Sequence, residues 1–386
     1  MPGGRFSALE SVFDGLETFL FVPNATSKRR GAHVHDAIDS KRTMSVVIFA
    51  LLPALLFGMY NVGLQHNIAL GQESSFWPTF FYGFLSVLPQ IVVSYAVGLG
   101  IEFIIAQLKH EEIQEGFLVT GILIPMIIPV ETPLWMIAVA TAFAVVFAKE
   151  VFGGTGYNVF NVALITRAFL FFSYPAAMSG DNVWVRLPST FGLGGEGKVV
   201  DGFTGATPLG QIAAGNVADI HNTLGNPLTD WDAFLGFLPG SVGEVSTLAI
   251  LIGACILIFT GIASYKIMVS GVVGVIAMAS LFNAIGTTPA MQVTALQHLL
   301  YGGFAFGIVF MATDPVTAAR TETGKWIYGF LIGVMVVFIR VLNAGYAEGM
   351  MLAILLMNTF APLIDYIVVE RNVSKRQARL VAKNKN

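Results

Sequence analysis

Ten apolar segments of roughly bilayer-crossing length constrain this chain more than any other feature. A hydrocarbon core about 30 Å thick needs about 20 helical residues to cross it. The chain is 55% apolar and 12% charged, with a mean hydropathy of +0.72, so a soluble fold would leave more apolar surface than one core can bury. The sequence predicts an all-α polytopic membrane protein. The expected spans are 44–62, 80–107, 117–129, 134–148, 160–174, 246–265, 267–285, 299–312, 326–342 and 350–368.

The distribution of Lys and Arg predicts the orientation of these spans. Six lie before the first span and six after the last. Five more fall in alternate loops or at their edges: Lys109, Lys149, Lys266, Arg320 and Lys325. By the positive-inside rule both termini are cytoplasmic and the central loop is periplasmic, which agrees with an even number of spans. Within 1–43, Phe6, Leu9 and Phe13 recur at helical spacing, which predicts an amphipathic helix at the membrane interface or, equally, a contact with a soluble partner.

The chain divides into two halves that resemble each other. Gly116-Phe117 opens an apolar run in the first half and Gly303-Phe304 opens one in the second, each followed by Pro, Thr and Trp in that order. Because five spans separate them, the pattern predicts an inverted repeat, with chance similarity of Gly-rich segments as the alternative. The expected domains are a cytoplasmic N-terminal segment, a first five-helix repeat, a periplasmic loop, a second five-helix repeat and a basic tail. Their bounds are 1–43, 44–177, 178–244, 245–368 and 369–386.

A few ionisable residues fall within or beside the expected spans. Charged groups at such positions cost about 2.5–3.5 kcal/mol on insertion scales, so they are rarely incidental. The acids could form a cation route, or the two arginines could pair with them and lock helices together. These residues are Glu102, Arg167, Asp314, Arg340, Glu348 and Asp365.

Redox chemistry in this chain would need an organic cofactor. Cys255 is the only cysteine, so the chain can form no internal disulfide and cannot ligate an iron–sulfur cluster alone. The six histidines show no metal-ligand spacing, and we expect no metal site. In the Gly-rich stretch 152–158, no Lys-Ser/Thr follows, so a bend near a buried ligand is favoured over a phosphate loop. Asn158 and Asn161 share one helical face and could hydrogen-bond either a heterocycle or neighbouring helices.

The central loop contains a Gly-rich stretch, 201–210, with a specific signature. Locally it is a turn, because Gly202 and Gly205 permit positive φ and Pro208 fixes the backbone after Thr207. Its core, Thr204-Gly205-Ala206-Thr207, resembles the (Ser/Thr)-Gly-Ala-Thr signature of flavoproteins that carry FMN in phosphoester linkage on the last Thr. A plain solvated turn is the alternative interpretation.

Nine stretches together resemble the family of B subunits of Na⁺-translocating NADH:quinone oxidoreductases, over nearly the whole chain. Thr204 stands where Ser is commoner in the family signature, and both residues offer a hydroxyl. The chain also has Gly98-Leu99-Gly100 where family members can carry adjacent glycines. The stretches are 33–42, 115–117, 149–161, 167–172, 204–207, 239–247, 311–316, 348–355 and 368–372.

The resemblance implies one component of an NADH:quinone reductase that exports Na⁺ across the bacterial inner membrane, with a urea-channel-like fold. It implies five partner subunits (A, C, D, E and F), a flavin transferase, membrane lipid and quinone, and no nucleic acid. The implied cofactors are covalent FMN at Thr207, beside Thr204, Gly205 and Ala206, and riboflavin, which we assign to Asn158 and Asn161. The implied quinone residues are Gly98, Glu115, Gly116 and Phe117, and the cation candidates are Glu102, Asp314 and Asp365.

Three alternatives fit parts of the sequence. The related D subunit of ion-pumping ferredoxin:NAD⁺ oxidoreductases also carries Thr-linked FMN, but its usual form lacks so long a basic N-terminal segment. A urea-channel-like transporter would share the inverted repeat but not the flavin signature. A structural scaffold would carry no cofactor. Covalent flavin therefore separates the two flavoprotein families from the transporter and the scaffold.

Overall fold

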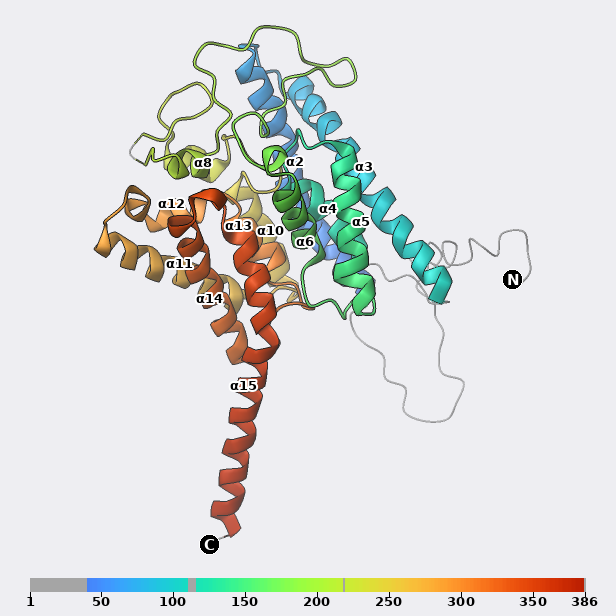
Figure 1. Cartoon of the computed structure of the whole chain (residues 1–386), viewed down its shortest axis with the longest axis vertical. Helices are drawn as coiled ribbons and strands as arrows, with labels where there is room; N and C mark the ends of the chain where they lie inside the picture. The colour runs from blue at the N-terminus through green and yellow to red at the C-terminus, as the bar shows by residue number, and fades with distance from the viewer. Residues whose placement is uncertain (1–39, 110–115, 218, 385–386) are drawn as a thin grey trace, which may run out of the picture.

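The computed structural model describes residues 40–109, 116–217 and 219–384, and the regular secondary structure in these ranges is helical (Figure 1). Extended pairing there is confined to two isolated bridges, Thr190 with Leu193 and His221 with Pro227. The predicted amphipathic helix in 1–43 lies outside the described residues, as does Glu115. The expectation of an all-α polytopic membrane protein is confirmed.

The helices follow the order of the predicted spans. The first half contains α2 (Ser40–Ala69), α3 (Phe76–Lys109), α4 (Gly116–Ile127), α5 (Leu134–Ala144), α6 (Val162–Ser173) and α7 (Pro175–Met178). The helix α5 continues through a π-helix, η2 (Val145–Lys149), and a 3₁₀ turn, η3 (Glu150–Phe152). The central loop carries α8 (Pro208–Ala213) and α9 (Asp230–Leu235). The second half contains α10 (Thr247–Phe259), α11 (Tyr265–Ile285), η4 (Pro289–Gln292), α12 (Ala295–Leu300), α13 (Phe304–Phe306), the π-helix η5 (Gly307–Met311), α14 (Glu322–Leu342), η6 (Ala344–Tyr346) and α15 (Met350–Asn384).

Six helices of the described chain are long and apolar enough to cross a membrane. The other four predicted spans coincide with shorter or broken helices. Three of them are α4, α6 and α10, each of 10–17 residues. The fourth, predicted at 299–312, is interrupted at 301–303, where Gly302 has a φ of +69° and separates α12 from α13. The third span also ends two residues earlier than predicted, because Pro129 disfavours helical backbone at the residue before it.

Close helix packing depends on glycines that face neighbouring backbone. Between α11 and α14, a Cβ atom at Gly274 would overlap the Phe330 carbonyl oxygen, and one at Gly333 would overlap that of Gly271. Glycines on both helices allow this approach, which supplies van der Waals contact where lipid offers no hydrophobic drive between helices. The two helices therefore act as one packed unit.

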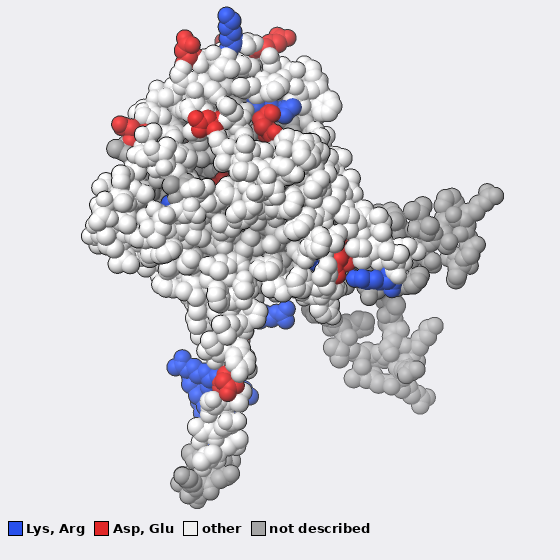
Figure 2. All heavy atoms as spheres, viewed as in Figure 1, with Lys and Arg blue, Asp and Glu red and all other residues white. Residues whose placement is uncertain are grey.

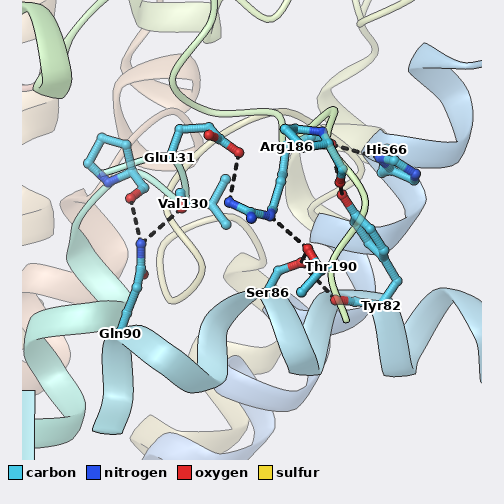
Figure 3. A network of polar contacts seen from close by, with 10 residues as sticks. His66, Tyr82, Ser86, Gln90, Val130, Glu131, Arg186 and Thr190 are labelled. Atoms are coloured by element: carbon cyan, nitrogen blue, oxygen red, sulfur yellow. Dashed lines mark hydrogen bonds and ion pairs between the residues drawn. The ribbon is translucent and has the colours of Figure 1, made fainter. Parts of the chain in front are cut away.

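A polar network fastens the central loop to α2 and α3 (Figure 3). His66 lies 2.8 Å through Nδ1 from the Arg186 carbonyl oxygen, and its Nε2 accepts a hydrogen bond of 3.1 Å from the Gly195 N–H. Because Nε2 accepts, the ring is neutral with its proton on Nδ1. The Arg186 guanidinium bonds the Glu131 carboxylate at 3.0 Å and the Thr190 hydroxyl at 2.8 Å. The loop is thus held through its backbone, by His66, and through the Arg186 side chain, by Glu131.

Charged side chains collect at the two ends of the molecule. Figure 2 shows a broad belt without charged side chains on the face in view, with mainly acidic residues beyond one end and basic residues along α15 beyond the other. The central loop lies at the first end, and the ends of α3, α5 and α15 lie towards the second (Figure 1). An uncharged belt between polar ends is the surface expected of a protein whose middle contacts lipid.

Candidate functional site

Thr207 forms the N-cap of α8. Its hydroxyl oxygen accepts a hydrogen bond of 3.1 Å from the Gly210 N–H, and Pro208 occupies the first helical position. Thr at the N-cap followed by Pro is a favoured helix start, so local sequence determines this geometry. Thr204 Oγ1 in turn accepts a bond of 3.3 Å from the Ala206 N–H. The Thr207 side chain remains half-exposed at the edge of the loop.

Gly205 has a structural role that the sequence does not reveal. It is buried, and a Cβ atom there would overlap the Asp181 carbonyl oxygen. Glycine is therefore required for the loop to close on itself immediately before Thr207, in addition to any room it leaves for a phosphate. Gln211 completes this closure by donating hydrogen bonds to the Ala206 carbonyl at 3.2 Å and to the His221 carbonyl at 2.8 Å.

Thr207 borders a hollow of about 330 Å³, part of it open to solvent. The opposite wall carries Ser241, Glu244 and Glu348, and Gly302 contributes backbone. The two carboxyl-bearing residues come from the segments that precede α10 and α15, so the hollow lies where the central loop meets the second half of the chain.

A buried ionic cluster lies beneath this hollow. Arg167, on α6, bonds Glu244 at 3.2 Å and also pairs with Glu348 and with the Ile127 carbonyl at the end of α4. Burial raises the pKa of Glu244, and the Arg167 guanidinium opposes that shift. Arg167, in the first half, therefore joins Glu244 of the central loop to Glu348 of the second half, as the helix-locking alternative expects.

Arg340, the second arginine in a predicted span, bonds backbone instead. Its guanidinium donates to the carbonyl oxygens of His298 at 2.6 Å, Tyr301 at 3.0 Å and Glu348 at 2.9 Å. These carbonyls lie around the interruption between α12 and α13 and at the start of α15, where helical partners are missing. Arg340 therefore stabilises a broken helix.

A second and larger cavity, of about 810 Å³ including space open to the surface, is formed by the starts of α2, α4 and α6 and the segments that follow α5, α10 and η5. Residues assigned from sequence to three different ligands share this cavity. They are Asn158 and Asn161 for riboflavin, Gly116 for quinone and Asp314 for the cation. Its polar lining also includes Lys149 and several threonines, Thr43, Thr120, Thr155 and Thr313.

The two asparagines are oriented by local hydrogen bonds. Asn161 is the N-cap of α6, and its Oδ1 accepts a bond of 3.2 Å from the Leu164 N–H. Asn158 Nδ2 donates to the Phe160 carbonyl at 3.0 Å. These bonds leave the Asn161 amide nitrogen as a donor and the Asn158 amide oxygen as an acceptor, the pair that an imide edge of a heterocycle requires.

Lys149 and Glu102 form a buried ion pair at the wall of the large cavity, with side chains only 5% and 6% exposed. The Lys149 ammonium also lies 5.9 Å from the centre of the Phe117 ring. The sequence marked Lys149 only as a loop-edge cation and Glu102 only as an acid in a span. Nothing in the sequence pairs the two, because they lie on separate helices.

The predicted quinone residues lie near one another, but in a closed arrangement. Phe117 is fully buried, and its ring fills the space beside Gly98, while Gly116 lies on the cavity wall against Thr155. Glu115 is not among the described residues. A flat ligand could therefore reach Gly116 from the cavity, whereas the Gly98 surface is covered by Phe117.

The three cation candidates lie in three different environments. Glu102 is paired with Lys149, whereas Asp314 lies in the cavity wall and accepts bonds from the Val316 N–H at 3.1 Å and the Thr317 hydroxyl at 3.0 Å. Burial raises the pKa of Asp314, and these two hydrogen bonds oppose that shift. Asp365 instead caps the start of α14, accepting from Arg320 N–H at 2.7 Å and from Thr321 N–H and hydroxyl at 2.9 and 2.6 Å. The described structure does not bring the three acids into one site.

Comparison with known proteins identifies the family. The sequence pattern of the NQR2, RnfD, RnfE family matches residues 27–374. The chain belongs to this family. It is 46% identical to the B subunit of the Na⁺-translocating NADH-quinone reductase of Pseudomonas paraeruginosa, with 98% of this chain and 96% of that protein covered. The proteins of the same name from Neisseria meningitidis and Haemophilus influenzae are 45% and 44% identical, each over 98% of this chain and 96% of its relative.

Membership of the NQR2, RnfD, RnfE family agrees with the resemblance drawn from the nine sequence stretches. Because the match extends over almost the full length of each relative, it includes the central loop with Thr207, the ionic cluster and the large cavity. The two cavities are therefore the places in which to look for the chemistry of this family member.

Proposed function

We propose that this chain is the membrane-spanning B subunit of a Na⁺-translocating NADH:quinone reductase. The observation that carries the proposal is the near full-length similarity to relatives of that name. The relatives also favour the quinone-reducing complex over the ferredoxin-linked one. In this assignment the chain works with the A, C, D, E and F subunits in the bacterial inner membrane, and electrons from NADH pass through it towards quinone while Na⁺ is exported.

Covalent FMN on Thr207 fits the local structure. The Thr207 oxygen accepts the Gly210 hydrogen bond, so the hydroxyl proton is not needed for the N-cap and can be replaced by a phosphoester while an oxygen stays in place. The hydroxyl is half-exposed beside a hollow, which gives a flavin transferase access. FMN would supply one- and two-electron chemistry there, and Thr207 would keep the cofactor from diffusing away.

Non-covalent riboflavin fits the large cavity. Asn158 and Asn161 line this cavity and present an acceptor and a donor to it, as the imide edge of a flavin requires. Asp314 and Glu102 line or flank the same cavity, so a cation route near the flavin is part of the proposal. The quinone would approach from the side of Gly116.

The same proposal includes ten spans in two inverted five-helix repeats. Six long helices, three shorter apolar helices and the broken segment 295–311 make ten crossings in sequence order. The third segment of each half is short and ends in a Pro-containing break, 128–133 in one and 312–321 in the other, as in repeats built from interrupted helices. Both termini are then cytoplasmic, with the Thr207 loop periplasmic, and the five domains keep the bounds predicted from the sequence.

In-gel ultraviolet fluorescence of the denatured protein, produced with its flavin transferase, tests the covalent site. Thr207→Ala is expected to abolish the fluorescence, whereas Thr204→Ala is the matched control and is expected to retain it. Peptide mass mapping should find FMN on the peptide that contains Thr207. A wild-type chain without flavin after exposure to the transferase would refute the redox assignment.

A further inference from the structure

Lys149 is placed to act on whatever occupies the large cavity. It is the last residue of the π-helix η2, and among the described residues that line the cavity only Lys149 and Asp314 are ionisable. Lysine presents three donors, one of which binds Glu102. The side chain is buried apart from the cavity, so its charge is weakly screened.

The ion pair has a direction with respect to the cavity. Lys149 belongs to the cavity wall, whereas Glu102 does not and packs behind it on α3. The pair is therefore a dipole whose positive end faces the ligand space. The other carboxylates near this dipole are Asp314, which also lines the cavity, and Glu150, which is engaged with Lys109 at 3.4 Å.

The backbone at this wall is also unusual. Both π-helices of the described chain, η2 and η5, contribute to the cavity, through Lys149 and Phe310 respectively. Such single-turn π segments occur mostly as bulges inside α-helices and frequently at functional sites, because the extra residue redirects a side chain. Here the first one ends at Lys149, whose ammonium pairs with Glu102 of α3 and lies 5.9 Å from the centre of the Phe117 ring of α4.

We propose that Lys149 is a positioning residue that sets the charge preference of the cavity. Its ammonium stabilises the negative charge placed on a planar heterocycle with a carbonyl or imide edge when that ligand receives one electron, originating from NADH. The electron is balanced by the ammonium charge already present in the ion pair, and no proton is transferred to the ligand in this step. Glu102 holds the ammonium in place and weakens its field. The inference rests on the proposed occupation of the cavity by non-covalent flavin.

The test is a potentiometric titration of the non-covalent flavin in the whole purified complex. Lys149→Met removes the positive end of the dipole at similar length, and we expect the reduced-to-oxidised ratio at a given potential to fall at least tenfold, equivalent to about 59 mV for one electron. Glu102→Gln removes the negative charge that weakens the field of Lys149, and we expect the reduced-to-oxidised ratio to rise. These opposite signs separate an electrostatic role from a structural one, because loss of packing would not raise the potential.

Lys109→Met is the matched control. Lys109 also pairs with a glutamate between α3 and the end of the α5 helix, but its side chain is 39% exposed and it does not line the cavity. We expect this variant to keep the wild-type ratio within twofold. If Lys149→Met prevents assembly because Glu102 is left unpaired, the double variant Glu102→Gln/Lys149→Met removes both charges and is expected to shift the ratio in the same direction as Lys149→Met, by less.

Two results would overturn the inference and one would overturn its foundation. The inference fails if Lys149→Met, or the double variant in its place, titrates like Lys109→Met. It also fails if Glu102→Gln and Lys149→Met shift the ratio in the same direction. If the assembled wild-type complex releases no riboflavin on denaturation, the proposed cavity ligand is wrong, and the inference falls with it.

Discussion

Gly98 and Gly100 offer a sharp test of the packing between α3 and α4. Both lie on α3, two residues apart, but face different surroundings. A Cβ atom at Gly98 would lie within 2.6 Å of three ring atoms of Phe117, whereas ordinary contact distances are 3.4–4 Å. A Cβ atom at Gly100 would meet nothing within 4 Å. The same substitution, Gly→Ala, therefore probes helix propensity alone at one position and packing at the other.

The expected magnitudes follow from two opposing effects. Ala is more favourable than Gly in a helix interior by about 0.8–1 kcal/mol, so Gly100→Ala should stabilise the protein by up to about 1 kcal/mol. At Gly98 the same gain is opposed by overpacking, which costs about 1–3 kcal/mol in a filled core. Phe117 cannot move aside easily, because it is fully buried and lies below Lys149. Gly98→Ala should therefore be less stable than Gly100→Ala by about 1–3 kcal/mol.

The assay is the rate at which the solubilised complex loses its assembled form on heating, followed by size exclusion of the tagged protein. Because heating is irreversible for such complexes, the comparison uses inactivation rates at one temperature. Adding Phe117→Leu, which removes the ring edge, should relieve the defect of Gly98→Ala but not change the effect of Gly100→Ala. Residues in contact couple by about 0.5–3 kcal/mol in such cycles. Equal rates for Gly98→Ala and Gly100→Ala, or no relief by Phe117→Leu, would refute the packing geometry.

Three further predictions concern the buried polar groups. Arg167→Met leaves the buried Glu244 carboxylate and the partly exposed Glu348 carboxylate without their cation. It should destabilise the protein by about 3–5 kcal/mol, seen as loss of assembled complex. Recovery on adding Glu244→Gln is expected, and its absence would count against the pairing. Asp365→Ala removes three hydrogen bonds at the start of α14. The Asp365→Ala complex should therefore inactivate faster on heating than the Asp365→Asn complex, in which the side chain keeps one acceptor oxygen. The reverse order of rates would contradict the capping role. Asn161→Ser retains an N-cap oxygen but lacks the amide donor. The complex should therefore keep its heat stability and lose non-covalent flavin on extraction. An unchanged flavin content would show that Asn161 does not bind the ligand.

Short-range sequence information accounts for the positions of most helices. Apolar length placed every long span, and the Thr-Pro sequence at Thr207 specified the start of α8. The breaks after α4 and between α12 and α13 are also local, because Pro129 and Gly302 impose backbone conformations that a continuous helix cannot adopt. The sequence did not show which of these shorter segments meet around a common space.

The sites required information that no single stretch contains. Asn158, Gly116 and Asp314 were assigned from sequence to three ligands, and the fold places them around one cavity. Lys149 was only a loop-edge charge until α3 brought Glu102 against it. Likewise nothing in the sequence around Glu244 indicated an ion pair. Only the packing of its loop against α6 gave it Arg167 as a partner.

The sequence by itself determined that this is a helical membrane protein, where its long spans lie, and that Thr207 lies in a Gly-rich turn of the central loop. These are local properties, set by the apolar length of a segment, the conformational limits of Pro and Gly, and hydrogen bonds within a few residues. Only the tertiary structure decided which buried charges neutralise one another and which polar side chains share a cavity. The reason is physical: a charge in a low-dielectric interior is stabilised by whichever opposite charge lies within a few ångströms, and that distance is unrelated to separation along the chain.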